Sequence, residues 1–151
     1  MSINRPSLHS EVEHFLNDKI PLTRAMGVRV AGINPITIEA PVSSNSNHLQ
    51  TAFGGSINAI ATLAAYTFLW LELHDDPSAY VVISESSIKF LKPVAETIRA
   101  ICQPPSDAEI CALKLAVAAN GRARIHLRVL VEENGATAAE FEGEFVAKRS
   151  A

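Results

Sequence analysis

Gly54 and Gly55 are the residues of this sequence whose type and position best suit chemistry. They follow a polar loop and open a long apolar run of helix-forming residues, which predicts a helix that begins at the glycine pair. The first N–H groups of a helix have no intrahelical partner and lie at the positive end of its dipole. Because glycine has no side chain, a ligand carbonyl can approach these N–H groups and be polarised by them. The same two glycines also suit a tight turn and close helix–sheet packing.

Three polar residues elsewhere are further candidates for a site. His48 lies in the preceding loop, and histidine is the residue type that titrates nearest neutral pH, although a solvated loop histidine has the same sequence signature. Asn58, one turn into the helix, either lines a pocket or is a buried amide with its hydrogen bonds satisfied. Glu85 lies in a polar run within a predicted strand, and this run fits either the site or the solvent face.

The helix predicted over 54–73 is apolar nearly all round, so it must be buried on most sides. Its length of about 30 Å is enough to cross a small sheet. Periodicity, turn residues and capping residues predict the other elements: a helix over about 10–17 with Ser10 as its N-cap, strands over 27–33, 36–42, 80–92 and 97–103, a loop over 43–51, a helix from the capping box Ser106–Glu109 to about 119, and a hairpin over 122–148. One apolar helix against one antiparallel sheet is a two-layer α+β architecture.

Charge selects a register for the final hairpin. A two-residue turn would place apolar residues opposite glutamates on the same face. A three-residue loop, 133–135, instead satisfies both faces of the hairpin. This register pairs Arg128 with Glu140, His126 with Glu142, Arg124 with Glu144, Leu127 with Phe141 and Ala123 with Phe145.

The composition bounds the class of protein. The 151 residues suit one domain over 1–151, and the hydrophobic fraction of 48% with only 19% charged residues favours an oligomer. A net charge of −3 without a basic run gives no reason to expect nucleic acid as a partner. The apolar stretch 57–73 carries polar residues, lacks basic flanks and is at the short limit for a membrane span, so a core helix is the better interpretation.

The two cysteines, Cys102 and Cys111, are interpreted as reduced thiols. No secretory signal is visible, so we expect a cytoplasmic protein. No CxxC or histidine-rich spacing is present, so no metal is expected.

Several motifs resemble those of hotdog-fold thioesterases. The run 47–56 has an Asn seven positions before the Gly-Gly pair that opens the central helix, and the string 88–93 looks like the strand that follows that helix. With Ile20-Pro21-Leu22, Met26-Gly27 and the terminal hairpin, the chain is similar from end to end to the thioesterase family of the YiiD C-terminal type. The fold that this resemblance implies is an α+β hotdog, an antiparallel β-sheet wrapped around one long central α-helix.

The resemblance also implies a homodimer, or a dimer of dimers, with active sites at the subunit interface. The Gly55 N–H would polarise the thioester carbonyl, Asn47 would help to position water or substrate, and the pantetheine arm would lie along the dimer groove. Coenzyme A or phosphopantetheine is then part of the substrate rather than a separate cofactor, and an acyl carrier protein is a candidate partner. The substrate would contact Phe53, Gly54, Ser56 and Asn58. Lys89, Lys92, Arg99 and Arg122 would meet phosphates or an acidic carrier surface, or be scattered surface charge.

The sequence departs from the family pattern at the position that usually carries the acid. Many hotdog thioesterases have Asp or Glu eight residues after the first glycine, and this chain has Thr62 at that position. Many also have His at the position of Phe53 and Gly at the position of Gln50. Thr62 could orient water but cannot be an ordinary general base. His48 and Glu85 are the candidates to fill that role.

Three functions therefore stay open. The first is hydrolysis of an acyl-CoA or acyl-carrier-protein thioester. The second is decarboxylation of a malonyl-type thioester, which needs an oxyanion stabiliser but no strong base. The third is binding of an acyl thioester without catalysis.

Overall fold

The computed structural model describes residues 7–150, so residues 1–6 and 151 of the predicted single domain lie outside the described part of the chain. In chain order the described elements are α1 (Leu8–Lys19), α2 (Leu22–Met26), β1 (Arg29–Ile33), β2 (Ile36–Pro41), a 3-10 helix (Val42–Ser44), α3 (Gly54–Leu73), β3 (Ala79–Phe90), β4 (Thr97–Gln103), α4 (Asp107–Asn120), β5 (Arg122–Glu133) and β6 (Ala136–Arg149).

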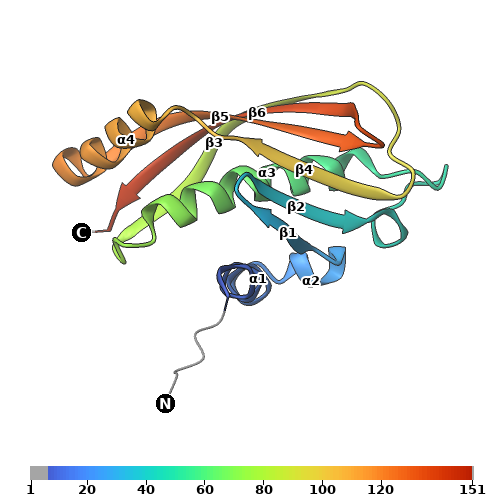
Figure 1. Cartoon of the computed structure of the whole chain (residues 1–151), viewed down its shortest axis with the longest axis horizontal. Helices are drawn as coiled ribbons and strands as arrows, with labels where there is room; N and C mark the ends of the chain where they lie inside the picture. Colours follow the sequence, from blue (N-terminus) through green and yellow to red (C-terminus); the bar gives the residue numbers. More distant parts are fainter. Residues whose placement is uncertain (1–6, 151) are drawn as a thin grey trace, which may run out of the picture.

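The six strands form one antiparallel sheet in the order β1-β2-β4-β5-β6-β3. The sheet curls around α3, which runs along its inner face, while α1 lies below α3 and α4 lies at one end of the sheet (Figure 1). Ile60 and Leu69 of α3 and Phe145 of β6 are completely buried between the two layers. This is the predicted α+β hotdog arrangement of a sheet around one central helix.

The predicted bounds of the central helix are confirmed, because α3 spans Gly54–Leu73. Although α3 is long and apolar enough to cross a membrane by composition, most of its sides pack in the core. One lengthwise stripe remains partly exposed. This open stripe consists of Gly55, Ala59, Thr62, Tyr66 and Trp70.

The predicted register of the last hairpin is wrong by two residues. Arg128 lies opposite Glu142 instead of Glu140, and Val129 instead of Leu127 lies opposite Phe141. Since a shift of two residues keeps each side chain on its predicted face, the apolar face still packs in the core and the charged face still points outward.

The turn geometry explains this error. The loop has two residues, Asn134 and Gly135, and both have the positive φ that a tight hairpin turn of type I′ requires. A bulge between Val131 and Glu132 then shifts the register by one residue and restores the match between faces. Two local irregularities thus replace the three-residue loop that the sequence suggested.

The chain start differs in two further details. Ser7, not Ser10, is the N-cap of α1, and its hydroxyl accepts a hydrogen bond from the Ser10 N–H. The short helix α2 was not predicted, because five residues are too few to show a helical period. It ends at Gly27 in a left-handed conformation, so the first strand begins at Arg29 instead of Gly27.

Strand β3 forms one edge of the sheet and pairs, within residues 7–150, with β6 on one side. Its free side leaves backbone groups without strand partners. Three of its apolar side chains, Tyr80, Val82 and Ile83, are at least 40% exposed. A long edge strand with exposed apolar residues is a template for pairing with another chain.

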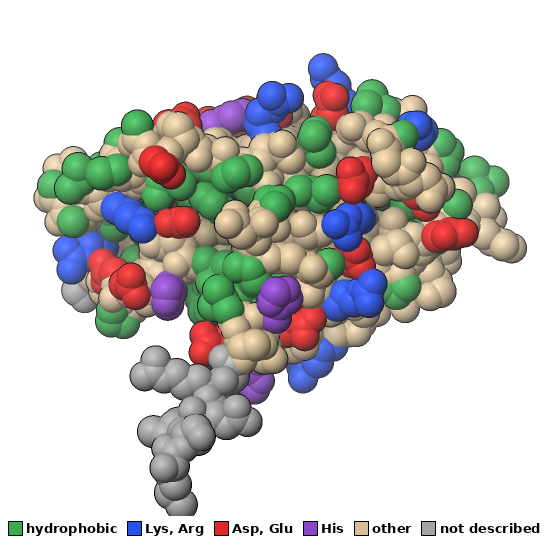
Figure 2. Space-filling model, in the orientation of Figure 1, with side chains coloured by type: hydrophobic (Ala, Val, Ile, Leu, Met, Phe, Trp, Pro, Cys, Tyr) green, Lys and Arg blue, Asp and Glu red, His purple; other side chains and the backbone are tan. Residues whose placement is uncertain are grey.

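Acidic and basic side chains are interspersed over the face seen in Figure 2 rather than gathered by sign. One carboxylate, that of Glu39, is only 6% exposed and accepts hydrogen bonds from Arg29 and Arg99. Burial raises the pKa of Glu39, but the hydrogen bonds and charges of the two arginines outweigh it and leave the pKa below its ordinary value. Arg99 also bonds Glu132 at 3.2 Å, so this network ties β1, β2, β4 and β5 together.

We expect this network to stabilise the protein above acid pH. Because the native pKa of Glu39 is lower than the value in the unfolded chain, about 4.3, its contribution is present above that value and is lost as the pH falls through the native pKa. Urea unfolding at several pH values should show that Glu39→Gln is less stable than the parent near neutral pH, and that the difference shrinks in acid. A difference that stays constant down to acid pH would contradict this role.

Candidate active site

The amino end of α3 presents the N–H groups of its first two residues. Within residues 7–150, the N–H groups of Gly54 and Gly55 have no hydrogen-bond acceptor. The next two, those of Ser56 and Ile57, both donate to the Phe53 carbonyl, at 2.9 and 3.1 Å. Phe53 is the N-cap and offers no side-chain cap, so the positive end of the helix is left open to a ligand.

Aromatic rings flank the glycine pair on two sides. A Cβ built on Gly54 would lie 3.3 Å from the Phe90 ring, and one built on Gly55 would overlap the Phe53 ring. Both rings are more than half exposed, as are Leu49 and Leu91 nearby in the chain. The free N–H groups therefore lie next to exposed apolar side chains, where an approaching carbonyl would be partly shielded from water.

Asn47 uses its side chain to hold the loop before α3. Its Oδ1 accepts hydrogen bonds from the N–H groups of Leu49 at 2.9 Å and Thr51 at 3.2 Å. Its Nδ2 donates to the Thr51 hydroxyl at 3.0 Å and the Ala52 carbonyl at 3.4 Å. Because its donors and its acceptor are all engaged, the predicted direct action of Asn47 on water or substrate is not supported by this geometry. Asn47 instead shapes the path of the chain into Gly54.

If Asn47 holds the loop before α3 and does not act in catalysis, its loss should reduce the stability of the protein. Asn47→Ala removes several partly buried hydrogen bonds, and we expect the free energy of unfolding to fall by about 1–3 kcal/mol. The matched control is His48→Ala, since His48 is exposed and its ring makes no hydrogen bond within the described residues. Chemical denaturation of both variants measures the difference. Unchanged stability of Asn47→Ala together with lost turnover would show that Asn47 acts directly instead.

Thr62 lies on the open stripe, two turns beyond Gly55. Its hydroxyl donates to the Asn58 carbonyl at 2.8 Å, so the oxygen presents lone pairs that can accept a hydrogen bond from water. The seven residues between Gly55 and Thr62 correspond to about 10 Å along the axis. One reacting carbonyl therefore cannot contact both groups of the same chain.

Two residues predicted to contact the substrate, Ser56 and Asn58, lie in the first turns of α3. Ser56 is half-buried beside the free N–H groups. The Oδ1 of Asn58 is buried and has no hydrogen-bond partner within residues 7–150, so the satisfied buried amide considered from sequence is not observed. An unpaired buried acceptor is costly, which suits an oxygen that receives a hydrogen bond from a ligand or water.

Glu85 is not brought to the amino end of α3. It pairs with Glu144 in the sheet, and Glu144 points to the face opposite the core. There Glu85 lines a shallow surface pocket with His126 and Glu142. A bulge in β3 between Ile83 and Glu85 contributes to this orientation, and the single sequence does not reveal it. The role of general base at the helix end therefore does not fit Glu85 within one chain.

The cysteines show no catalytic arrangement. Cys102 is buried, and burial raises the pKa of its thiol to about 12, which makes it a poor nucleophile. Cys111 is exposed on α4. Across the described residues, no three His, Cys, Asp or Glu side chains lie close enough together to hold a metal ion.

The sequence interpretation did not predict a groove that lies beside the second half of α3. This aromatic groove has a volume of about 480 Å³. Its lining residues belong to α1, to α3, to β3 and to the turn between α3 and β3. They include Phe15, Tyr66, Trp70, Leu73, Tyr80 and Val81. The signal in the sequence was the spacing of the open stripe, in which small residues are followed by large aromatic ones.

Comparisons with known proteins show the family and support the fold. The family model described as "Putative thioesterase (yiiD_Cterm)" matches residues 9–149. A protein of unknown function from Chlorobaculum tepidum superposes with a TM-score of 0.87 at 25% identity, and the match covers 95% of each chain. A protein from Shewanella oneidensis described as a putative thioesterase has a TM-score of 0.81 at 23% identity, covering 93% of this chain and 97% of its own. A probable thioesterase from Pseudomonas aeruginosa has a TM-score of 0.82 at 21% identity, covering 96% and 98%.

Proposed function

Because the chain belongs to the thioesterase family of the yiiD C-terminal type, we propose that it hydrolyses an acyl thioester of coenzyme A or of an acyl carrier protein. The single observation that carries this proposal is the pair of N–H groups at Gly54 and Gly55, which have no acceptor within residues 7–150 and lie beside exposed apolar side chains. Donors aimed at a carbonyl oxygen stabilise the negative charge that develops there during attack by water. The water oxygen bonds to the carbonyl carbon, the C–S bond breaks, and the thiol leaves with the proton that the water gives up.

A homodimer is part of this proposal. The separation of about 10 Å between Gly55 and Thr62 means that both can act on one thioester only if they come from different chains. The free edge of β3 supplies the surface for such a pairing, since its exposed apolar residues need cover. In this dimer the Gly55 N–H of one copy polarises the carbonyl and the Thr62 hydroxyl of the other orients the water.

The substrate's carrier would meet basic residues near the aromatic rings. Lys89 and Lys92 are exposed on either side of Phe90 and Leu91 and can reach phosphates of coenzyme A or an acidic carrier surface. Arg99, by contrast, is engaged with Glu39 and Glu132. His48 remains the candidate base, from the exposed loop. We propose a cytoplasmic location for this reaction, without a metal.

One observation favours a second reaction. The open stripe carries Thr62 where a carboxylate would be expected, and decarboxylation of a malonyl-type thioester needs oxyanion stabilisation without a general base. In that reaction the C–C bond to the carboxylate breaks, carbon dioxide leaves, and the electron pair of that bond forms an enolate whose oxygen is held by the same Gly55 N–H. A proton from the solvent then adds to the enolate carbon and gives the acyl thioester.

A panel of acyl-CoA and malonyl-CoA thioesters tests both reactions. Release of free thiol, followed with a thiol reagent, supports hydrolysis. Carbon dioxide from malonyl-CoA with the thioester intact supports decarboxylation instead. Tight binding with neither product would make the protein a non-catalytic acyl-thioester binder and would overturn the proposed hydrolase.

A further inference from the structure

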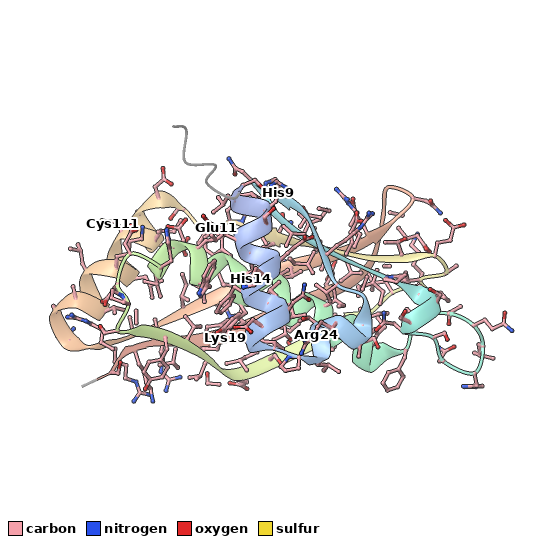
Figure 3. All side chains as sticks on the ribbon, turned by 90° about the horizontal axis from the view of Figure 1, so that it is seen from below. His9, Glu11, His14, Lys19, Arg24 and Cys111 are labelled. Atoms are coloured by element: carbon pink, nitrogen blue, oxygen red, sulfur yellow. The ribbon has the colours of Figure 1, made fainter. Side chains whose placement is uncertain are left out.

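Asn45 lies at the base of the loop that leads into α3. It follows the 3-10 helix after β2 and is only 4% exposed. Its side-chain Nδ2 donates two hydrogen bonds of 2.8 Å, one to the Met26 carbonyl and one to the Pro41 carbonyl. In Figure 3, α2, which carries the labelled Arg24, lies between α1 and the segment that leads into α3. One buried side chain therefore ties the end of α2 and the end of β2 to the start of this loop.

The main chain of Asn45 extends this connection to the N-cap of α3. Its carbonyl accepts a hydrogen bond of 2.7 Å from the Phe53 N–H. The Phe53 carbonyl in turn accepts the N–H groups of the third and fourth helix residues, at 2.9 and 3.1 Å. Because this carbonyl and the Gly54 N–H belong to one planar peptide unit, the orientation of Phe53 sets the direction of the Gly54 N–H and of the Gly55 N–H that follows it.

The returning side of the loop is held by the chain after β3. The Ala52 N–H donates to the Val94 carbonyl at 2.8 Å, and Val94 is completely buried. Ala52 also pairs with Ser46 in an isolated antiparallel bridge. The base of the loop is thus held on both sides. Asn45 and Asn47 have different tasks in it, because Asn45 fixes the base of the loop and Asn47 fixes its tip.

The side-chain oxygen of Asn45 indicates that this residue is needed for its two donors. Its Oδ1 is buried and has no hydrogen-bond partner within residues 7–150. A buried acceptor without a partner lowers the stability of a protein. A neutral amide is the side chain of this size that supplies two N–H donors from one nitrogen, and its oxygen comes with them. A local cost of this kind is typical of residues at functional sites.

We propose, on the basis of the hydrolysis proposed above, that Asn45 is a positioning residue that directs the Gly54 and Gly55 N–H groups at the thioester carbonyl through Phe53. Asn45 does not contact the substrate, since it is buried and both its donors are engaged with main-chain carbonyls. Oxyanion donors act only at hydrogen-bond distance from the charged oxygen. A displacement of about 1 Å costs about 10²-fold in rate, so the loss of these anchors lowers kcat.

The first experiment measures kcat and KM of Asn45→Asp for an acyl-CoA thioester. Aspartate keeps the shape of the side chain but removes both N–H donors to Met26 and Pro41. We expect kcat to fall by about 10–10²-fold. KM should stay within about twofold of the parent value, because the donors act mainly on the transition state. Asn45→Ser, which keeps one hydroxyl donor, should show a smaller fall and serves if the aspartate variant does not fold.

Thr37→Val is the matched control for a loss of stability alone. Thr37 is also only 4% exposed, and its hydroxyl donates to the Pro35 carbonyl at 3.2 Å. It lies next to Ile36, which lines a pocket together with Phe68 in the second half of α3. Its removal should therefore reduce stability in urea and leave kcat at the parent value.

A second measurement tests the position of the N–H groups without turnover. Residual dipolar couplings of isotope-labelled protein report the direction of each N–H bond relative to the rest of the molecule. Asn45→Asp should change the couplings and chemical shifts of the Gly54 and Gly55 amides. Thr37→Val should leave both amides as they are in the parent protein.

The outcomes separate this inference from the proposed function. If the parent releases no thiol from any thioester, hydrolysis is wrong, and the dipolar couplings still decide whether Asn45 directs the two N–H groups. If Asn45→Asp is less stable but keeps the parent kcat and the parent couplings, Asn45 is only structural and the inference is overturned. A rise in KM at unchanged kcat, or a fall in kcat with unchanged couplings, would overturn it as well.

Discussion

Replacing Gly55 with proline should lower kcat/KM for thioester hydrolysis by about 10²–10³-fold, the usual effect of losing one oxyanion donor. Proline removes the backbone N–H of Gly55, which within residues 7–150 has no acceptor of its own. Proline is tolerated in the first turn of a helix, where no intrahelical hydrogen bond is lost. The substitution therefore removes the proposed donor and leaves α3 otherwise intact.

Gly55→Ala is the matched control for this experiment. Alanine keeps the N–H but adds the same Cβ, which meets the Phe53 ring. Since Phe53 is 56% exposed, its ring can rotate away at small cost. We expect Gly55→Ala to retain most of the activity that Gly55→Pro loses, with both variants folded by circular dichroism. Equal losses in the two variants would mean that space at position 55, rather than its N–H, limits the reaction.

Placing charge on the free edge of β3 should abolish turnover by separating the two copies of the proposed homodimer. Val82 and Ile83 are 42% and 40% exposed in the single chain, so Val82→Lys with Ile83→Lys costs the isolated fold little. Two lysines on an edge strand oppose pairing with another strand through desolvation and repulsion. We expect the double variant to sediment as a monomer with thiol release near the background, because Gly55 and Thr62 would no longer meet at one thioester.

Leu115→Lys provides the comparison, because Leu115 is 65% exposed on α4 rather than on β3. This variant should keep the sedimentation behaviour and turnover of the parent. A fully active monomer of the double β3 variant would contradict the shared site. A double variant that remains dimeric would instead show that another surface joins the copies.

The sequence alone determined those features that depend on local chemistry. The span of α3 was predicted because alanines and leucines favour helix and no proline interrupts them. The capping box of α4 was also predicted, since Ser106 and Glu109 satisfy each other's backbone within one turn. The Gly54–Gly55 pair belongs here too. Its N–H groups have no acceptor in the described part of the chain, and this follows from the position of the pair at the helix start.

Tertiary structure decided the features that depend on distant partners. The bulge in β3 contributes to placing Glu85 on the outer face of the sheet. In the last hairpin, the turn and the bulge set the register. Charge pairing alone could not distinguish this register from another that is shifted by two residues, because both keep each side chain on the same face. The aromatic groove exists because Phe15 of α1 packs on Trp70, more than fifty residues later in the chain. Periodicity along one element reports which side chains share a face, but only packing determines what that face meets.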